Sequence, residues 1–282
     1  MAAKKKKVSA KTAPAKKPAK KIVAKPAARA KAPAAKPAKS APKVSAAAQA
    51  AARDVSRLLI EIKAVHCRPE QPYIFTSGRA SPVYIDCRKI ISFPEARAKI
   101  MAHAHKVIGD AIGWSKIDVV AGGETAGIPF SAFIAQTAKK PMIYVRKQPK
   151  GFGRMAQIEG ELKPGQRVLL VEDLATDGGS KIMFIEALRK AEAKVTDCFV
   201  VFHYGIFPQS VDTLSVMGVK LHQLATWWDV LAAAERGKYF DAKGLAETRG
   251  FLEAPDAWSA AHGGAGPKPG QVRMPSIAGG AR

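Results

Sequence analysis

The chain has 282 residues, is 47% hydrophobic and carries a formal net charge of +23 at pH 7. That hydrophobic content supports a packed core, whereas no apolar run reaches the roughly 20 residues of a membrane span, which excludes a transmembrane helix. Cys67, Cys87 and Cys198 are odd in number and widely spaced, which excludes a disulfide framework and a paired-cysteine zinc site and predicts a cytoplasmic protein.

The first segment of the chain, residues 1–46, is a tail rich in Lys, Ala and Pro. Residues 1–53 contain fourteen Lys and two Arg but no Asp or Glu, so only +7 of the net charge belongs to the rest of the chain. Like-charge repulsion and repeated proline oppose a packed core. We therefore expect this tail to be disordered.

Three interpretations of the tail compete. One is weak binding to nucleic acid or another polyanion through counterion release. A second, an organelle import peptide, is disfavoured because such peptides use Arg and Ser on an amphipathic helix, whereas Lys and Pro dominate here. The third is a passive extension without a function, and the sequence does not separate it from the first.

Alternating segments after the tail predict one α/β domain with a parallel sheet, residues 47–255. Helices are expected at residues 47–65, 94–111, 125–138, 179–191, 226–236 and 242–252. Strands are expected at residues 73–75, 83–86, 117–121, 142–145, 168–171, 196–202 and 219–224. Residues 256–282 turn to Gly, Pro and Ala and are predicted to form a second disordered tail.

The apolar strand at residues 168–171 ends in two carboxylates, Glu172 and Asp173, and a small loop then opens a helix. The loop contains Thr176, Gly178, Gly179 and Ser180. A helix start offers backbone N–H groups and the positive end of the helix dipole to a phosphate. Ionised carboxylates beside it accept hydrogen bonds from vicinal sugar hydroxyls or hold Mg²⁺ through water. The segment therefore predicts a ribose 5-phosphate site.

Two commoner phosphate motifs do not fit the chain. A Walker loop requires Gly-Lys-Ser/Thr, whereas Ser180 precedes Lys181 here, which disfavours nucleoside triphosphate hydrolysis. Residues 151–156 have the form of a dinucleotide fingerprint, but no helical pattern follows them.

A cationic segment follows the predicted strand at residues 142–145. Its basic residues are Arg146, Lys147, Lys150 and Arg154. Interleaved proline and glycine disfavour a helix or a regular strand. A solvated basic loop is the ordinary explanation of such a charge run. The segment is tethered between two predicted core strands, at the edge where open α/β sheets bind ligands. We therefore interpret it as a mobile flap that covers an anionic ligand, and not as a solvated loop.

Four blocks, in this order along the chain, resemble the type I phosphoribosyltransferases, and their orotate branch in particular. Residues 75–88 resemble the N-terminal hood of that branch, and residues 122–129 its pyrophosphate loop. Residues 144–160 resemble its mobile catalytic loop. Residues 171–180, Val-Glu-Asp-Leu-Ala-Thr-Asp-Gly-Gly-Ser, are similar to the superfamily's signature for phosphoribosyl pyrophosphate. The resemblance spans residues 56–255.

The resemblance implies the type I phosphoribosyltransferase fold, a parallel α/β sheet with a small N-terminal hood. It implies a Mg²⁺-dependent enzyme that forms orotidine 5'-monophosphate and pyrophosphate from orotate and phosphoribosyl pyrophosphate, as a homodimer with a flap shared between subunits. Its catalytic residues would be Arg146, Lys147, Lys150 and Asp173. Other substrate contacts would be Thr125, Ala126, Phe152, Glu172, Leu174, Ala175, Thr176, Asp177, Gly178, Gly179 and Ser180. Glu172 and Asp173 would hold the metal indirectly.

Some positions depart from the family pattern. Phe152 stands where a flap histidine is usual, and Ala126 stands where a lysine is often found. Ala175 and Asp177 alter the small loop after Asp173, residues 174–180, which we call the phosphate loop, and Asp177 is expected to turn outward because its charge would repel a phosphate.

A further departure concerns the base. His203 and Tyr204 stand where many relatives have an Asp-Arg pair whose arginine meets the orotate carboxylate. A phosphoribosyltransferase for another base therefore stays an alternative. A non-catalytic regulator that senses phosphoribosyl pyrophosphate and binds nucleic acid through its tail is a second one, against which the retained flap cations argue.

Overall fold

The centre of the described chain is a six-stranded sheet with the strand order β10-β9-β8-β5-β6-β7. The computed structural model describes residues 45–149, 157–176, 179–207 and 209–265. The strands are β5 (Val119–Gly123), β6 (Met142–Val145), β7 (Ile158–Glu159), β8 (Arg167–Ala175), β9 (Lys194–His203) and β10 (Lys220–Thr226). Neighbouring strands are parallel except for β6 and β7, which run antiparallel. The expected parallel α/β sheet is confirmed, with one antiparallel edge strand added.

The strand β8 is longer than the apolar run that predicted it. The prediction covered residues 168–171, whereas β8 continues to Ala175, which still pairs with His203 of β9. Glu172 and Asp173 therefore lie on the strand itself rather than after it. Because adjacent strand residues point to opposite faces, the two carboxylates leave the sheet on different sides.

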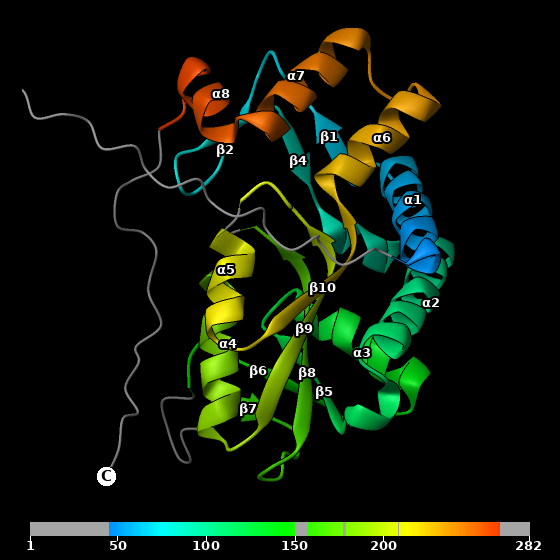
Figure 1. Ribbon diagram of the computed structural model, residues 1–282, viewed down its shortest axis with the longest axis vertical. Coiled ribbons are helices and arrows are strands. Elements are labelled where there is room, and N and C mark those ends of the chain that lie inside the picture. The colour runs from blue at the N-terminus through cyan, green and yellow to red at the C-terminus, as the bar shows by residue number, and fades with distance from the viewer. Residues whose placement is uncertain (1–44, 150–156, 177–178, 208, 266–282) are drawn as a thin grey trace, which may run out of the picture. The chain divides into compact units, whose positions relative to one another are not determined.

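Helices cover both faces of the sheet (Figure 1). One face carries α1 (Ala46–Glu61), α2 (Pro94–Ala111) and α3 (Gly127–Ala138), and the other carries α4 (Gly179–Lys190) and α5 (Gln209–Val216). Two apolar clusters result, with Phe130 and Phe199 in the first and Phe184 and Cys198 in the second. Burial on both faces explains why the central strands are continuous apolar runs in the sequence.

The predicted hood is present beside the C-terminal helices (Figure 1). It consists of β1 (Val65–Cys67), β2 (Tyr73–Ile74), β3 (Ala80–Ser81), β4 (Val83–Ile85) and the 3-10 helix η1 (Cys87–Ser92). β1 pairs with β4 and β2 with β3, both antiparallel. Phe75 packs edge-on against Tyr204, which directly follows β9, with ring centroids 6.3 Å apart. The hood therefore rests on the carboxyl end of the sheet.

The chain beyond β10 forms α6 (Trp227–Gly237), α7 (Ala242–Glu253) and α8 (Pro255–Ala261). The prediction that the domain ends at residue 255 is wrong for residues 256–265. Asp256 pairs with Arg79 of the hood at 2.6 Å, and Ser259 Oγ accepts a hydrogen bond from the Ala80 backbone N–H at 2.9 Å. The small residues that suggested disorder are ordered by these contacts with a distant part of the chain.

Short elements escaped the sequence patterns. They are β1, β3, β7, α5, α8 and the 3-10 helices η1 and η2 (Trp114–Lys116). Periodicity needs several turns or alternations to be recognised, and these elements offer too few. By contrast, α2 and β6 have the predicted boundaries. None of the described helices is long and apolar enough to cross a membrane.

Candidate active site

The phosphate loop lies where the chain changes direction across the sheet. From β5 the chain passes outward to β6, and it later returns to β8 on the other side of β5. Open α/β sheets form a ligand crevice at such a switch point, outside the carboxyl ends of the strands. The pyrophosphate loop follows β5 and the phosphate loop follows β8, so the fold brings these two sequence blocks to one place.

Glu172 is a buried carboxylate with an unsatisfied oxygen. The residue is 7% exposed, and its Oε1 has no hydrogen-bond partner among the described residues. Two glycines make room for it, because a Cβ on Gly123 would overlap Oε1 and one on Gly127 would lie 2.5 Å from it. Burial raises the pKa of Glu172 to about 7, against the opposing charge of Lys181. A buried acceptor of this kind needs a donor that the described residues do not supply.

Asp173 is also buried, at 8% exposure. Burial raises its pKa, and the charges of Lys181 and Arg88 act in the opposite direction. Arg88 belongs to η1 of the hood, where its Nε donates to Asp86 at 2.7 Å. The structure thus places Asp173 within reach of the hood's charge, while Glu172 lies between the starts of α3 and α4.

Lys181 lies beside Glu172, although no sequence pattern assigned it to the site. It is 3% exposed; its Nζ donates to the Leu174 carbonyl at 2.7 Å and lies 3.9 Å from Glu172 Oε2. The available signal is helical spacing, because residue 181 shares one stripe with Ile185 and Leu188, which are both buried. That stripe predicts a buried position for a residue that is usually exposed.

His203, the last residue of β9, is a further buried polar group at this end of the sheet. The Ser210 hydroxyl donates to the Phe207 carbonyl at 2.9 Å, so its oxygen accepts the Nε2–H of His203 at 2.7 Å. Burial and the charge of Lys181 lower the pKa of His203 to about 4. His203 is therefore neutral at physiological pH, and its hydrogen bond joins the end of β9 to the start of α5.

The phosphate loop itself is described in part. Leu174 and Ala175 complete β8, Thr176 follows, and Gly179 and Ser180 begin α4. A helix start presents N–H donors and a positive dipole end to an anion, as the sequence predicts here. Asp177 and Gly178 lie outside the described residues, so the expected outward turn of Asp177 stays a prediction.

The pyrophosphate loop meets the start of the flap. Glu124 Oε2 accepts a hydrogen bond from the backbone N–H of Lys147 at 2.8 Å. Thr125 follows a cis peptide bond, and Ala126 precedes α3 without a side-chain cap on the helix. The first-turn N–H groups of α3 are thus not capped by a side chain, which suits them to a phosphate oxygen.

The flap leaves and rejoins the sheet at one edge. β6 and β7 are antiparallel neighbours, and the Arg146 N–H donates to the Gln157 carbonyl at 2.8 Å just beyond them. The Arg146 guanidinium lies 3.8 Å from Glu159, whereas the charge of Lys147 reaches Glu172 and opposes the rise of its pKa. The remaining predicted flap residues, Lys150, Phe152 and Arg154, lie outside the described residues.

Tyr204 has a structural position in place of the arginine found in many relatives. It is 3% exposed, and its ring lies 6.0 Å from that of Phe202 and 5.7 Å from that of Trp227. With His203 neutral beside Tyr204, these two residues offer no positive charge to a substrate carboxylate. Tyr204 thus extends the aromatic core around Phe202 and Trp227 and does not face a substrate as a charged residue would.

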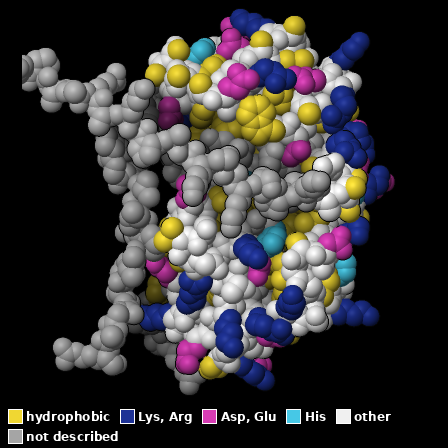
Figure 2. All heavy atoms as spheres, viewed as in Figure 1, with side chains coloured by type: hydrophobic (Ala, Val, Ile, Leu, Met, Phe, Trp, Pro, Cys, Tyr) yellow, Lys and Arg dark blue, Asp and Glu magenta, His cyan; other side chains and the backbone are white. Residues whose placement is uncertain are grey.

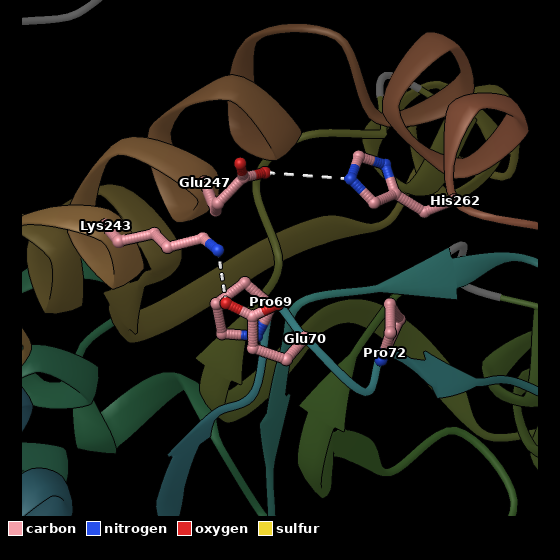
Figure 3. A pocket seen from close by; sticks show the side chains of 6 residues that line it. All are labelled: Pro69, Glu70, Pro72, Lys243, Glu247 and His262. Carbon is pink, nitrogen blue, oxygen red and sulfur yellow. Dashed lines mark hydrogen bonds and ion pairs between the residues drawn. The ribbon is translucent and has the colours of Figure 1, made fainter.

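A separate cavity of about 320 Å³ lies between the hood and the C-terminal helices (Figure 3). It is lined by Pro69, Glu70, Pro72, Lys243, Glu247 and His262. Lys243 pairs with Glu70, and His262 lies 3.9 Å from Glu247. Its charged groups thus have partners within the cavity, and no lining residue belongs to the four sequence blocks. The carboxyl ends of β5 and β8 are the better candidate for the active site.

Comparisons with known proteins agree with this geometry. The model of the phosphoribosyl transferase domain family matches residues 89–228. The chain is 51% identical over 215 residues to an orotate phosphoribosyltransferase of Cereibacter sphaeroides, across 76% of this chain and 93% of that protein. It is 52% identical over 210 residues to one of Rhizobium rhizogenes, across 74% and 90%. The crystal structure of an orotate phosphoribosyltransferase from Aeropyrum pernix gives a TM-score of 0.57 at 29% identity, across 66% and 99%.

The matched domain and the sheet define the class of protein, a type I phosphoribosyltransferase. Within that class, the chain belongs to the orotate phosphoribosyltransferase family. The resemblance carried by the four sequence blocks is confirmed, and the chain is a pentosyltransferase rather than a non-catalytic sensor.

Proposed function

We propose that the crevice between β5 and β8 transfers the phosphoribosyl group of phosphoribosyl pyrophosphate to orotate, giving orotidine 5'-monophosphate and pyrophosphate. The observation that carries this assignment is the carboxylate pair Glu172 and Asp173, buried at the carboxyl end of β8 beside the start of α4. Family membership supports orotate as the base.

Each part of the donor has its own residues in this proposal. Glu172 and Asp173 accept hydrogen bonds from the ribose hydroxyls. The residues around the 5'-phosphate are Leu174, Ala175, Thr176, Asp177, Gly178, Gly179 and Ser180. The residues around the pyrophosphate are Thr125, Ala126, Arg146, Lys147 and Lys150, with Phe152 on the same flap. The hydrogen bond between Glu124 and Lys147 supports the joint action of pyrophosphate loop and flap.

The reaction is a displacement at the anomeric carbon, where pyrophosphate leaves and a base nitrogen attacks a centre with oxocarbenium character. Such a reaction needs little covalent help. It needs positive charge beside the leaving group, which Lys147 and the other flap cations supply, and it needs the exclusion of water, which flap closure supplies.

Mg²⁺ fits this site as an ion bound together with the donor. The described residues include no group of three or more His, Cys, Asp or Glu side chains that could hold a metal by themselves. Mg²⁺ commonly uses one or two carboxylates together with substrate phosphates. Glu172 and Asp173 offer two, and Glu172 Oε1 lacks a partner among the described residues. Held indirectly by them, the ion would add positive charge beside the leaving pyrophosphate.

We further propose that the protein acts in the cytoplasm as a homodimer whose flap reaches the partner's site. The odd number of cysteines, with no paired spacing, supports the cytoplasm, and the flap's origin at the sheet edge supports a flap shared between subunits.

The shared flap is tested by mixing the Lys147→Ala and Asp173→Asn variants and measuring activity after the subunits have exchanged. With a shared flap, one site of each mixed dimer has both residues and activity returns. If activity stays at the level of the separate variants, each subunit uses its own flap.

The assay of the reaction is pyrophosphate release from phosphoribosyl pyrophosphate and Mg²⁺ with a panel of bases. We expect release with orotate and none with uracil or purines. Turnover of another base, with none of orotate, would replace the proposal by the alternative that His203 and Tyr204 raise.

We also propose a second, separable role for the tail, weak binding to nucleic acid or another polyanion. Its support is the composition of residues 1–53, which contain sixteen basic residues and no acidic one. In contrast, Lys and Arg side chains are interspersed with Asp and Glu on the face of the described chain in Figure 2. Residues 1–44 lie outside the described residues, so the expected disorder stays a prediction.

A further inference from the structure

Lys181 occupies a position that is unfavourable for a lysine in two respects. It lies in the first turn of α4, where the helix dipole disfavours positive charge, and its side chain is only 3% exposed. Lysine is rarely buried unless it is paired, because removing an ammonium group from water is costly. An arrangement with such a cost calls for a compensating set of contacts.

Those contacts join the two flanks of the phosphate loop. The Nζ of Lys181 donates to the Leu174 carbonyl at 2.7 Å, which connects the start of α4 to the end of β8. The same Nζ lies 3.9 Å from Glu172 Oε2, too long for a hydrogen bond but close enough for charge attraction. The Oε2 side of Glu172 is therefore attracted toward the start of α4, while Oε1, which packs against Gly123 and Gly127, has no hydrogen-bond partner among the described residues.

We propose that Lys181 is a positioning residue of the donor site, which fixes Leu174 and the Glu172 carboxylate relative to the start of α4 so that they receive the ribose 5-phosphate part of the donor. This inference rests on the proposed function, because it concerns the same crevice. It adds a group that does not touch the substrate and approaches the site from inside the protein. The lysine of a Walker loop, by contrast, contacts the phosphates directly.

A purely structural ion pair is the rival explanation, and the contacts distinguish the two. Buried pairs that serve stability alone need close geometry and satisfied partners. Here the hydrogen bond goes to a backbone carbonyl, and the Glu172 oxygen Oε1 remains without a partner among the described residues. The charge of Lys181 also opposes the rise of the Asp173 pKa, so it acts on both carboxylates.

The test uses Lys181→Met, which keeps the chain length but removes the charge and the donor. Titration calorimetry with ribose 5-phosphate should show a Kd about tenfold to a hundredfold higher than in the wild type, the range for losing a hydrogen bond to a charged group. The KM for phosphoribosyl pyrophosphate should rise with it, whereas the KM for orotate at saturating donor should not change. A merely structural role would not separate these two KM values.

Lys190→Met is the matched control, because Lys190 lies exposed in the last turn of the same helix. It should leave both KM values and the ribose 5-phosphate affinity unchanged. Lys181→Gln, which keeps an N–H donor for the Leu174 carbonyl but no charge, should fall between Lys181→Met and the wild type.

Three results would overturn the inference. They are unchanged ribose 5-phosphate affinity in a folded Lys181→Met, equal rises in both KM values, and loss of the fold in both Lys181 variants by circular dichroism. Failure of the proposed function is a different result, namely a wild-type protein that binds ribose 5-phosphate but releases no pyrophosphate with orotate. In that case weaker binding by Lys181→Met would still support the positioning role.

Discussion

The two ends of β8 hold charged groups in opposite circumstances. At the amino end, Arg167 pairs with Asp118 at 2.5 Å, and Asp118 also accepts the Arg167 backbone N–H at 2.8 Å. These hydrogen bonds hold the pKa of Asp118 well below its usual range. At the carboxyl end, Glu172 and Asp173 are buried, and burial raises the pKa of both.

This difference separates a structural pair, Arg167 with Asp118, from the pair that we propose to be functional, Glu172 and Asp173, at the other end of β8. A carboxylate whose hydrogen bonds are complete contributes to the fold and has little capacity left for a ligand. A buried carboxylate with an incomplete set disfavours its own charged form and gains when a ligand supplies the missing partners. Substitutions at the two ends of β8 should therefore have opposite consequences for stability and for activity.

The largest effect on turnover is expected at the flap. Lys147→Ala should lower kcat about a hundredfold while changing donor affinity much less, because the cation acts on charge that develops on the leaving pyrophosphate. Lys150→Ala should behave in the same way, although Lys150 lies outside the described residues. Steady-state rates and donor binding, measured on the same preparations, check the difference.

Lys163→Ala is the control for the flap variants, since Lys163 is exposed on the connection between β7 and β8 and its ammonium group lies 3.5 Å from the exposed Glu161. It should retain wild-type rates. If Lys147→Ala and Lys150→Ala also retain them, the assignment of the flap is wrong.

The second prediction compares the carboxylates at the two ends of β8. Asp173→Asn should lower kcat/KM for the donor about tenfold to a hundredfold, because it removes a charged acceptor for ribose and a partner for Mg²⁺. Its Tm should stay the same or rise, since the fold disfavours the ionised form of Asp173. Asp118→Asn should lower Tm and leave kcat/KM unchanged. Calorimetry and initial rates on both variants would contradict this reading if Asp173→Asn loses mainly stability.

The third prediction concerns the neutral His203. Its pKa of about 4 lies below the ordinary value of 6.5, so between these pH values the unfolded chain binds a proton that the folded chain does not. The free energy of unfolding should therefore fall by about 3 kcal/mol through this residue as pH drops from 6.5 to 4. Urea unfolding of wild type and His203→Gln at both pH values isolates that contribution. An equal loss in both proteins would exclude His203 as the source.

Long elements and ordered motifs were predictable from the sequence. The bounds of α2 follow from a helical pattern that begins at Pro94, a favoured residue in the first helical turn, and the bounds of β6 follow from an apolar run. The strand and the helix that flank the predicted phosphate loop were predictable because an apolar run, a small loop and a helical pattern follow one another there, and the loop's role stays a prediction.

The remaining features depend on partners that are distant in the chain. Three-residue strands such as β1 form because β4 supplies their hydrogen bonds, and α8 is ordered by the contacts of Asp256 and Ser259 with the hood. The burial of Lys181 was hidden because a lysine is usually exposed, and only the arrangement of β8 against α4 supplies its carbonyl partner. Local patterns cannot report such pairings.

The smallest effect on catalysis is expected from deletion of residues 1–44. Every sequence block begins at or after residue 75, and the deletion keeps Ser45, whose Oγ caps α1 by accepting the Ala48 N–H at 3.1 Å. Turnover and both KM values should therefore be nearly unchanged.

The full-length protein should bind DNA or RNA with a logarithmic salt slope of about −0.7 to −0.9 per neutralised phosphate, and the deletion should remove most of this binding. Loss of catalysis would make the tail part of the enzyme. Full-length protein that ignores nucleic acid at low salt would leave the passive extension as the explanation.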